Sequence, residues 1–172
     1  MRRTGTTRRS ALTATGAFAL GAVLTGCGDG PEGASASGGT DARAASLRAG
    51  KALRAAAARD SAALLARYDQ VATAHPVAEA GIAPMRETVR EHLKALGGAA
   101  RASAASPAPT APASDPRAAL RELAGEERRV ADGRAAALLT ADPELARLLA
   151  SVAAAGAAHA YLLTELAKET AA

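Results

Sequence analysis

Aromatic residues and cysteine are almost missing from this chain of 172 residues. It contains no tryptophan, one phenylalanine, two tyrosines and a single cysteine, Cys27. A chain with one thiol forms no internal disulfide, and a cysteine-rich metal or iron–sulfur site is excluded. Beyond Cys27 the only aromatic residues are Tyr68 and Tyr161, so no aromatic platform is present on which bases or sugars would stack.

Strand-forming residues are scarce as well. The apolar content is largely alanine and leucine, and Ile82 is the only isoleucine. Alanine and leucine are among the best helix formers, whereas β-branched and aromatic residues favour strands. The composition therefore predicts an all-α protein.

A basic excess is also lacking once the first 26 residues are set aside. The whole chain carries 21 Lys and Arg against 17 Asp and Glu. Four arginines and no acid precede Cys27, so 17 residues of each sign remain beyond it. Nucleic-acid-binding proteins carry a basic excess, and the sequence therefore predicts no nucleic-acid partner.

The N-terminus has the organisation of an export signal. Arginines at positions 2, 3, 8 and 9 precede an apolar stretch at 11–24. This stretch is shorter than the roughly 20 residues that a membrane-spanning helix needs. It ends in Leu24-Thr25-Gly26-Cys27, which resembles the lipobox of bacterial lipoproteins. The resemblance implies a signal peptide at 1–26, cleaved to leave a lipid-modified Cys27 as the new N-terminus.

Two acyl chains on Cys27 suffice for stable membrane anchoring. We see no second segment of spanning length in the sequence, so we expect the protein to stand on the outer face of the cytoplasmic membrane. Thr7–Leu12 partly matches a twin-arginine export motif, so both the general secretory (Sec) route and the twin-arginine route stay open. The stretch 27–45, rich in glycine, alanine and serine, predicts a flexible tether.

Two helices are predicted in the first half of the remaining chain. The first runs from Asp41 or Ser46 to Ala74, because the residue before Pro76 is pushed out of the α region. The second covers about 77–96 and stops at two glycines. Pro84 lies inside it, where it either kinks the helix or opens its firm part.

Two Asp-Pro pairs predict the remaining helices. Asp115 and Asp142 each place a capping carboxylate before a proline at the first helical position, opening helices at about 116–139 and 143–168. Short turns at 75–76 and 141–142 make two helical hairpins, which an irregular loop at 98–115 joins. The pattern predicts a four-helix bundle domain at 46–168. Close approach of neighbouring helices is the expected use of three glycines inside these helices: Gly125, Gly133 and Gly156.

One ionisable residue lies within the apolar stripe of each helix: Asp60, His92, Glu127 and His159. Helical spacing from their apolar neighbours predicts that all four point inward. Within each hairpin, the acid and the histidine lie at nearly the same distance from the turn. Three interpretations stay open: a site for one divalent metal ion, buried pairing with Arg134 as the counter-ion of Glu127, or side chains that reach solvent. Tyr68 and Tyr161 are expected at the rim of the core with their hydroxyls in water.

The two-hairpin bundle in a lipid-anchored, alanine-rich chain resembles the ferritin-like domains of uncharacterised lipoproteins from high-GC Gram-positive bacteria, over about residues 46–168. Metal-binding members of that class carry Glu-x-x-His on two helices. Here Val89 and Gly156 stand three residues before His92 and His159. The resemblance therefore implies one metal ion at most, and neither a di-iron oxidase nor an iron store.

Taken together, the sequence predicts a non-enzymatic binding or interaction module that is lipid-anchored outside the cytoplasm and needs no cofactor. The membrane, reached through the lipid on Cys27, is the partner that the sequence indicates. The class of any protein or small-molecule partner stays open. The alternative is a ferritin-like protein that holds one divalent metal ion at Asp60, His92, Glu127 and His159.

Overall fold

The computed structural model describes residues 36–98 and 110–170, and these residues form four α-helices and one short 3-10 helix. The α-helices are α1 (Ala36–Ala74), α2 (Glu79–Ala95), α3 (Pro116–Ala137) and α4 (Pro143–Glu169), and the 3-10 helix η1 (Pro76–Ala78) links α1 to α2. The described residues contain no strand, so the all-α prediction is confirmed. The predicted signal, Cys27 and the first part of the tether lie outside the described residues, as does the loop at 99–109.

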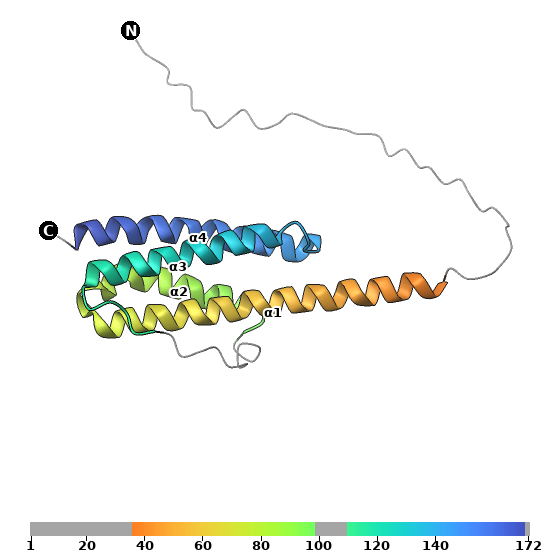
Figure 1. Cartoon of the computed structure of the whole chain (residues 1–172), viewed down its shortest axis with the longest axis horizontal. Coiled ribbons are helices and arrows are strands. Elements are labelled where there is room, and N and C mark those ends of the chain that lie inside the picture. The colour runs from red at the N-terminus through yellow and green to blue at the C-terminus, as the bar shows by residue number, and fades with distance from the viewer. Residues whose placement is uncertain (1–35, 99–109, 171–172) are drawn as a thin grey trace, which may run out of the picture. The chain divides into compact units, whose positions relative to one another are not determined.

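The four helices pack side by side as two hairpins, which together are called the bundle below (Figure 1). The α1–α2 turn lies beside the chain that leads into α3, since His75 Nε2 is 2.9 Å from the carbonyl oxygen of Ala113. The α3–α4 turn lies at the other end, where Asp142 packs against Gly50 of α1. The connection from α2 to α3 therefore begins and finishes at opposite ends of the bundle. The turns of the two hairpins therefore lie at opposite ends of the bundle and not at the same end.

Both Asp-Pro pairs cap helices as predicted. The Asp115 carboxylate accepts a hydrogen bond from the backbone N–H of Ala118 at 2.8 Å. Asp142 accepts from two N–H groups, those of Glu144 at 3.1 Å and Leu145 at 3.0 Å. Each proline takes the first helical position, where its missing N–H breaks no hydrogen bond.

We expect Asp142→Ala to lower the free energy of unfolding by about 1 kcal/mol, because two N–H groups at the start of α4 lose their acceptor. Asp132→Ala is the matched control: Asp132 lies exposed in the second half of α3, where it caps no helix, and we expect a change within about 0.5 kcal/mol. Urea unfolding of the two variants measures the difference. Equal effects would show that Asp142 does not cap α4.

Leucines and other apolar residues from all four helices fill the core. One cluster joins Leu64 and Tyr68 of α1 to Ile82 of α2, Leu120 of α3 and Leu163 of α4. A second cluster, nearer the α3–α4 turn, contains Leu93 and Leu96 with Leu145 and Leu149. The apolar stripes predicted from helical spacing are therefore the faces that the bundle buries.

Helix boundaries differ from the predictions mainly at the start of α1. The helix begins at Ala36, so residues 36–45, assigned to the tether, are helical. Alanines and arginines favour a helix here, although the side chains described from Gly39 to Ala49 are almost all exposed. α2 begins at Glu79, five residues before the alternative start at Pro84, and it continues through that proline. It ends as predicted before Gly97 and Gly98, both of which have positive φ.

Only one of the three helix glycines has the predicted use. A Cβ at Gly156 would lie 3.2 Å from Glu127 Oε2 and 3.3 Å from the Ala131 Cβ, so this glycine lets α4 approach α3. A Cβ at Gly125 or Gly133 would meet nothing within 4 Å, and the prediction is wrong for both. Gly81 makes the tightest approach instead, because a Cβ there would lie 2.7 Å from a methyl of Leu166.

Helix α4 is long and apolar enough to cross a membrane by length and composition alone, with a mean hydropathy of 1.3 over 18 residues. By that criterion the expectation of no second spanning segment is wrong. Leu145, Leu149, Val152 and Leu163 of this helix are nevertheless buried against the other helices, as in the core helix of a globular domain.

Candidate functional site

A buried carboxylate lies at the centre of the bundle's polar residues. Glu127 of α3 is 1% exposed, and its Oε1 accepts a hydrogen bond of 2.8 Å from the hydroxyl of Tyr68 on α1. His159 Nδ1 of α4 lies 3.0 Å from the same oxygen. Because an ionised carboxylate only accepts, the Nδ1 atom carries the hydrogen of that bond. Three helices thus meet at one oxygen atom.

Tyr68 is fully buried, so the expectation that its hydroxyl lies in water is wrong. Burial raises the pKa of Tyr68 far above its ordinary value, and the charge of Glu127 raises it further. The tyrosine therefore stays protonated and serves Glu127 as a permanent hydrogen-bond donor. Tyr161, in contrast, is 62% exposed, as expected for a side chain at the rim.

His92 brings the fourth helix to this group. Its ring stacks on that of His159 with the centroids 6.4 Å apart and the planes inclined by 22°. The side chain is half-buried, and burial lowers the pKa of His92, as do the charges of Arg134 and His159, while Glu127 opposes them. The neutral imidazole is therefore favoured in the folded protein.

We expect the stability to fall when the pH drops below 6.5, the ordinary pKa of histidine. His92 has a lowered pKa in the folded state, so the unfolded chain takes up the proton first and is stabilised by it. His92→Gln removes this titration and should flatten that part of the profile. The unfolding midpoint in urea, measured from neutral pH to about pH 5 for both proteins, tests this. If the unfolding midpoint depended on pH equally in both proteins, the lowered pKa of His92 would be contradicted.

Arg134 lies beside these groups on α3 and is 4% exposed. Its Nη2 donates to Ser61 Oγ at 2.7 Å and to the carbonyl oxygen of Ala57 at 3.4 Å. Burial lowers the pKa of Arg134, whereas the charges of Asp60 and Glu127 raise it. Arg134 thus lies within the electrostatic influence of Glu127 without forming an ion pair with it, and its hydrogen bonds go to α1. Among the described residues, its Nε is the buried side-chain atom that lacks a hydrogen-bond partner.

Asp60 does not join the other three predicted residues. Its side chain is exposed, and the neighbouring Ser61 is the residue that points inward, with no exposed surface. The expectation that all four residues point inward is therefore wrong for Asp60, and the metal-site interpretation loses that member. The remaining three are Glu127 and His159, which are bonded to each other, and His92, which stacks on His159.

Glu127, His159 and Tyr68 form a buried hydrogen-bonded group that joins α3, α4 and α1. In the described part of the chain, no three His, Cys, Asp or Glu residues are placed to hold a metal ion. Two surface hollows lie away from the group. One, of about 210 Å³, is lined by residues of α1 and Asp142. The other, of about 440 Å³, lies between the end of α1 and Pro112.

The sequence did not indicate Tyr68 as a member of the group, nor Ser61 as the hydrogen-bond partner of Arg134. For Tyr68 a signal was present, since it lies four residues after Leu64 and three before Val71 on the buried stripe. A tyrosine on that stripe needs a partner for its hydroxyl when it is buried.

Comparisons of the chain with protein-family models, curated proteins and solved structures find no match.

Proposed function

We propose that the chain is a lipid-anchored lipoprotein that acts as a non-enzymatic binding or interaction module on the outer face of the cytoplasmic membrane. The anchor would be Cys27, and the working part would be the outer surface of the four packed helices. The bundle's interior would then serve to hold the helices in register.

The observation that carries this proposal is the state of Glu127. Its Oε1 already accepts hydrogen bonds from Tyr68 and His159, which come from two other helices. A carboxylate held this way is well suited to fix the positions of helices, because a shift of any one helix would leave a buried polar group unpaired. The other oxygen, Oε2, lies against Gly156 of α4, so both oxygens of Glu127 face neighbouring helices.

A ferritin-like architecture fits the topology. Ferritin-like bundles join their two hairpins by one long crossover connection. Here the connection between α2 and α3 starts and finishes at opposite ends of the bundle, as the contacts of His75 and Gly50 require. We therefore propose that the chain is a ferritin-like domain whose polar centre has become structural.

A reduced site for one divalent metal ion is the second candidate. The observation in its favour is that His92, Glu127 and His159 come from three helices and lie next to one another. For such a site, Glu127 or His159 would have to give up the hydrogen bond between them. Stoichiometric iron, manganese or zinc in protein purified without chelator, lost in Glu127→Gln, would favour this candidate over the first.

The lipid anchor is tested by Cys27→Ser. We expect the unchanged chain to be recovered with membranes and to carry the added mass of a lipid on Cys27. Cys27→Ser should lose both the lipid and the cleavage after residue 26. Thr25→Ser is the matched control, because it alters the lipobox without touching the acylated residue. If the chain that keeps Cys27 carried no added lipid mass, the proposed anchor would be refuted.

A further inference from the structure

The N-terminal part of α1 carries unbalanced positive charge. Over residues 39–54, called the basic arm below, the cations are Arg43, Arg48, Lys51 and Arg54, and the only acid is Asp41. The first three cations are exposed, and Arg54 is half-buried where it donates to the carbonyl oxygen of Ala95 at the end of α2. Beyond the α3–α4 turn, α1 continues without a neighbouring helix (Figure 1).

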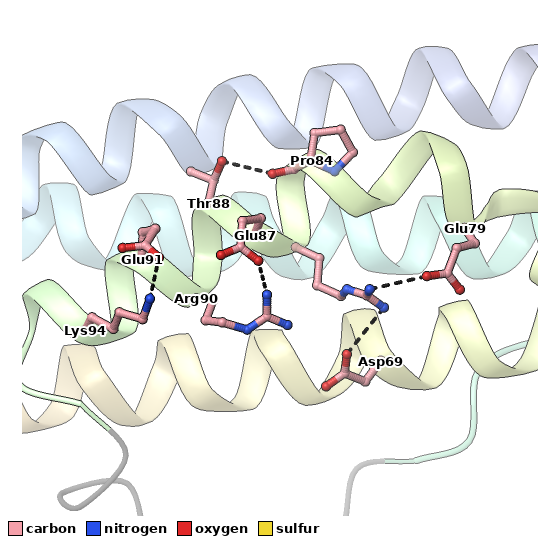
Figure 2. Close-up of polar contacts among 9 residues, drawn as sticks. Asp69, Glu79, Pro84, Glu87, Thr88, Arg90, Glu91 and Lys94 are labelled. Carbon is pink, nitrogen blue, oxygen red and sulfur yellow. Dashed lines mark hydrogen bonds and ion pairs between the residues drawn. The ribbon is translucent and has the colours of Figure 1, made fainter.

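Three cations of the basic arm lack the ion-pair partners that neutralise many of the cations on the other helices. Figure 2 shows α2, where Arg90 pairs with Glu87 and Lys94 with Glu91, each three residues apart. Similar pairs occur on α3 and α4. Arg43, Arg48 and Lys51 make no ion pair or hydrogen bond with any described residue. The acid that lines the same surface hollow as Lys51 and Arg54 is Asp142, which makes no ion pair with either of them.

The charges also share one side of the helix. At 100° per residue, Arg43, Arg48, Lys51 and Arg54 fall within an arc of about 140°. Leu47, which is 59% exposed, lies inside that arc. The alanines at positions 42, 45, 49 and 52 lie on the opposite side, with Ser46 and Leu53. With one large apolar residue, this face suits adsorption by charge and not deep insertion into lipid.

We propose that the basic arm docks on the anionic phospholipid headgroups of the membrane in which Cys27 is anchored, an inference that rests on the proposed anchor. Eight residues separate Cys27 from Ala36, the first residue of α1, so the two are nine residue steps apart. At no more than about 3.6 Å per step, they hold the start of α1 within roughly 32 Å of the lipidated residue. The anchor thus concentrates the arm at the bilayer surface. Electrostatic attraction then acts when the arm comes within a Debye length of about 8 Å.

Docking would orient the whole domain. Helix α1 is continuous over 39 residues, and its second half forms one side of the bundle. When the arm lies on the headgroups, α1 therefore lies along the bilayer and the bundle is held beside it. The exposed surfaces of the other helices would then be presented at a set height above the membrane, which a free tether alone would not fix.

The test uses the full lipidated chain, reconstituted in phosphatidylcholine vesicles with or without phosphatidylglycerol. Once Cys27 is acylated, an introduced Ala44→Cys supplies the only thiol, and it carries an environment-sensitive fluorophore on the charged side of the arm. A second labelled chain, with Val77→Cys at the other end of the bundle, serves as the reference. We expect headgroup-bound quencher to reach the label at 44 only in vesicles with phosphatidylglycerol, and salt to reverse the effect.

Charge removal makes the test specific. A triple variant, Arg43→Gln with Arg48→Gln and Lys51→Gln, should lower the docking equilibrium by on the order of 100-fold, since each cation contributes about fivefold. The matched control removes three unpaired cations from α3, by Arg117→Gln, Arg121→Gln and Arg128→Gln, and should leave docking unchanged. Quenching at 44 that is the same with and without phosphatidylglycerol, or the same in both triple variants, would overturn the docking proposal.

Failure of the anchor has a different signature. If the chain without an introduced cysteine reacts with a thiol reagent and does not float with vesicles of either composition, Cys27 is not acylated. The anchor and the docking that rests on it then both fall. A chain that floats with both kinds of vesicle but shows no dependence on phosphatidylglycerol keeps the anchor and loses only the docking.

Discussion

Glu127→Ala should lower the free energy of unfolding by about 3 kcal/mol or more. The substitution leaves the hydroxyl of Tyr68 and the Nδ1–H of His159 buried without an acceptor, and each unpaired group costs about 1–3 kcal/mol. It also opens a cavity where α3 meets α4 and removes the carboxylate that packs against Gly156. Unfolding in urea, followed by helical circular dichroism, measures the loss.

Glu126→Ala is the control for that experiment. Glu126 precedes Glu127 on the same helix, but its side chain is 32% exposed and pairs with Arg129, which is 65% exposed. An exposed ion pair three residues apart contributes about 0.5 kcal/mol or less. If Glu126→Ala destabilised the protein as much as Glu127→Ala, the buried hydrogen-bonded group would not be what holds the helices together.

Leu163→Ala should cost about 3 kcal/mol, because Leu163 is fully buried in the cluster shared by all four helices. Its neighbour Leu162 is 49% exposed, and Leu162→Ala should change the free energy of unfolding by about 0.5 kcal/mol or less. The pair of variants matters because α4 meets the length and composition of a membrane-spanning helix. In a spanning helix both leucines would face an apolar environment. Similar costs for both substitutions would therefore contradict the packing of α4 in the bundle.

The all-α class and most helix ends could be read from the sequence because their causes are local. An aspartate before a proline caps a helix by contacts within four residues, and glycines such as Gly97 and Gly98 end one through their own backbone. The apolar stripes of α2 and α4 likewise follow from spacing alone.

Asp60 shows where local reasoning stops. At 100° per residue, Asp60 and Ser61 lie on either side of the stripe that Leu64, Tyr68 and Val71 form. Which of the two is buried depends on the side from which the other hairpin packs. The buried Arg134 of α3, which donates to Ser61, shows that this is the side of Ser61. Because alanines occur on all sides of this helix, the sequence does not show which side is buried.

Tyr68 and Glu127 are 59 residues apart, and only the packing of α1 against α3 brings them together. The sequence identified Glu127, His92 and His159 as inward-facing residues, and the structure brings these three together. Which of these residues bond to or stack on one another, however, depends on how the helices pack in the bundle.

The most direct test of the account is a double-mutant cycle between Tyr68 and Glu127. Free energies of unfolding are measured for Tyr68→Phe, Glu127→Gln and the double variant. If the buried group holds the helices in register, the two substitutions should be coupled by about 1–2 kcal/mol, within the range found for residues in one hydrogen-bonded network. Effects that add to within about 0.5 kcal/mol would contradict the claim that this polar centre is structural.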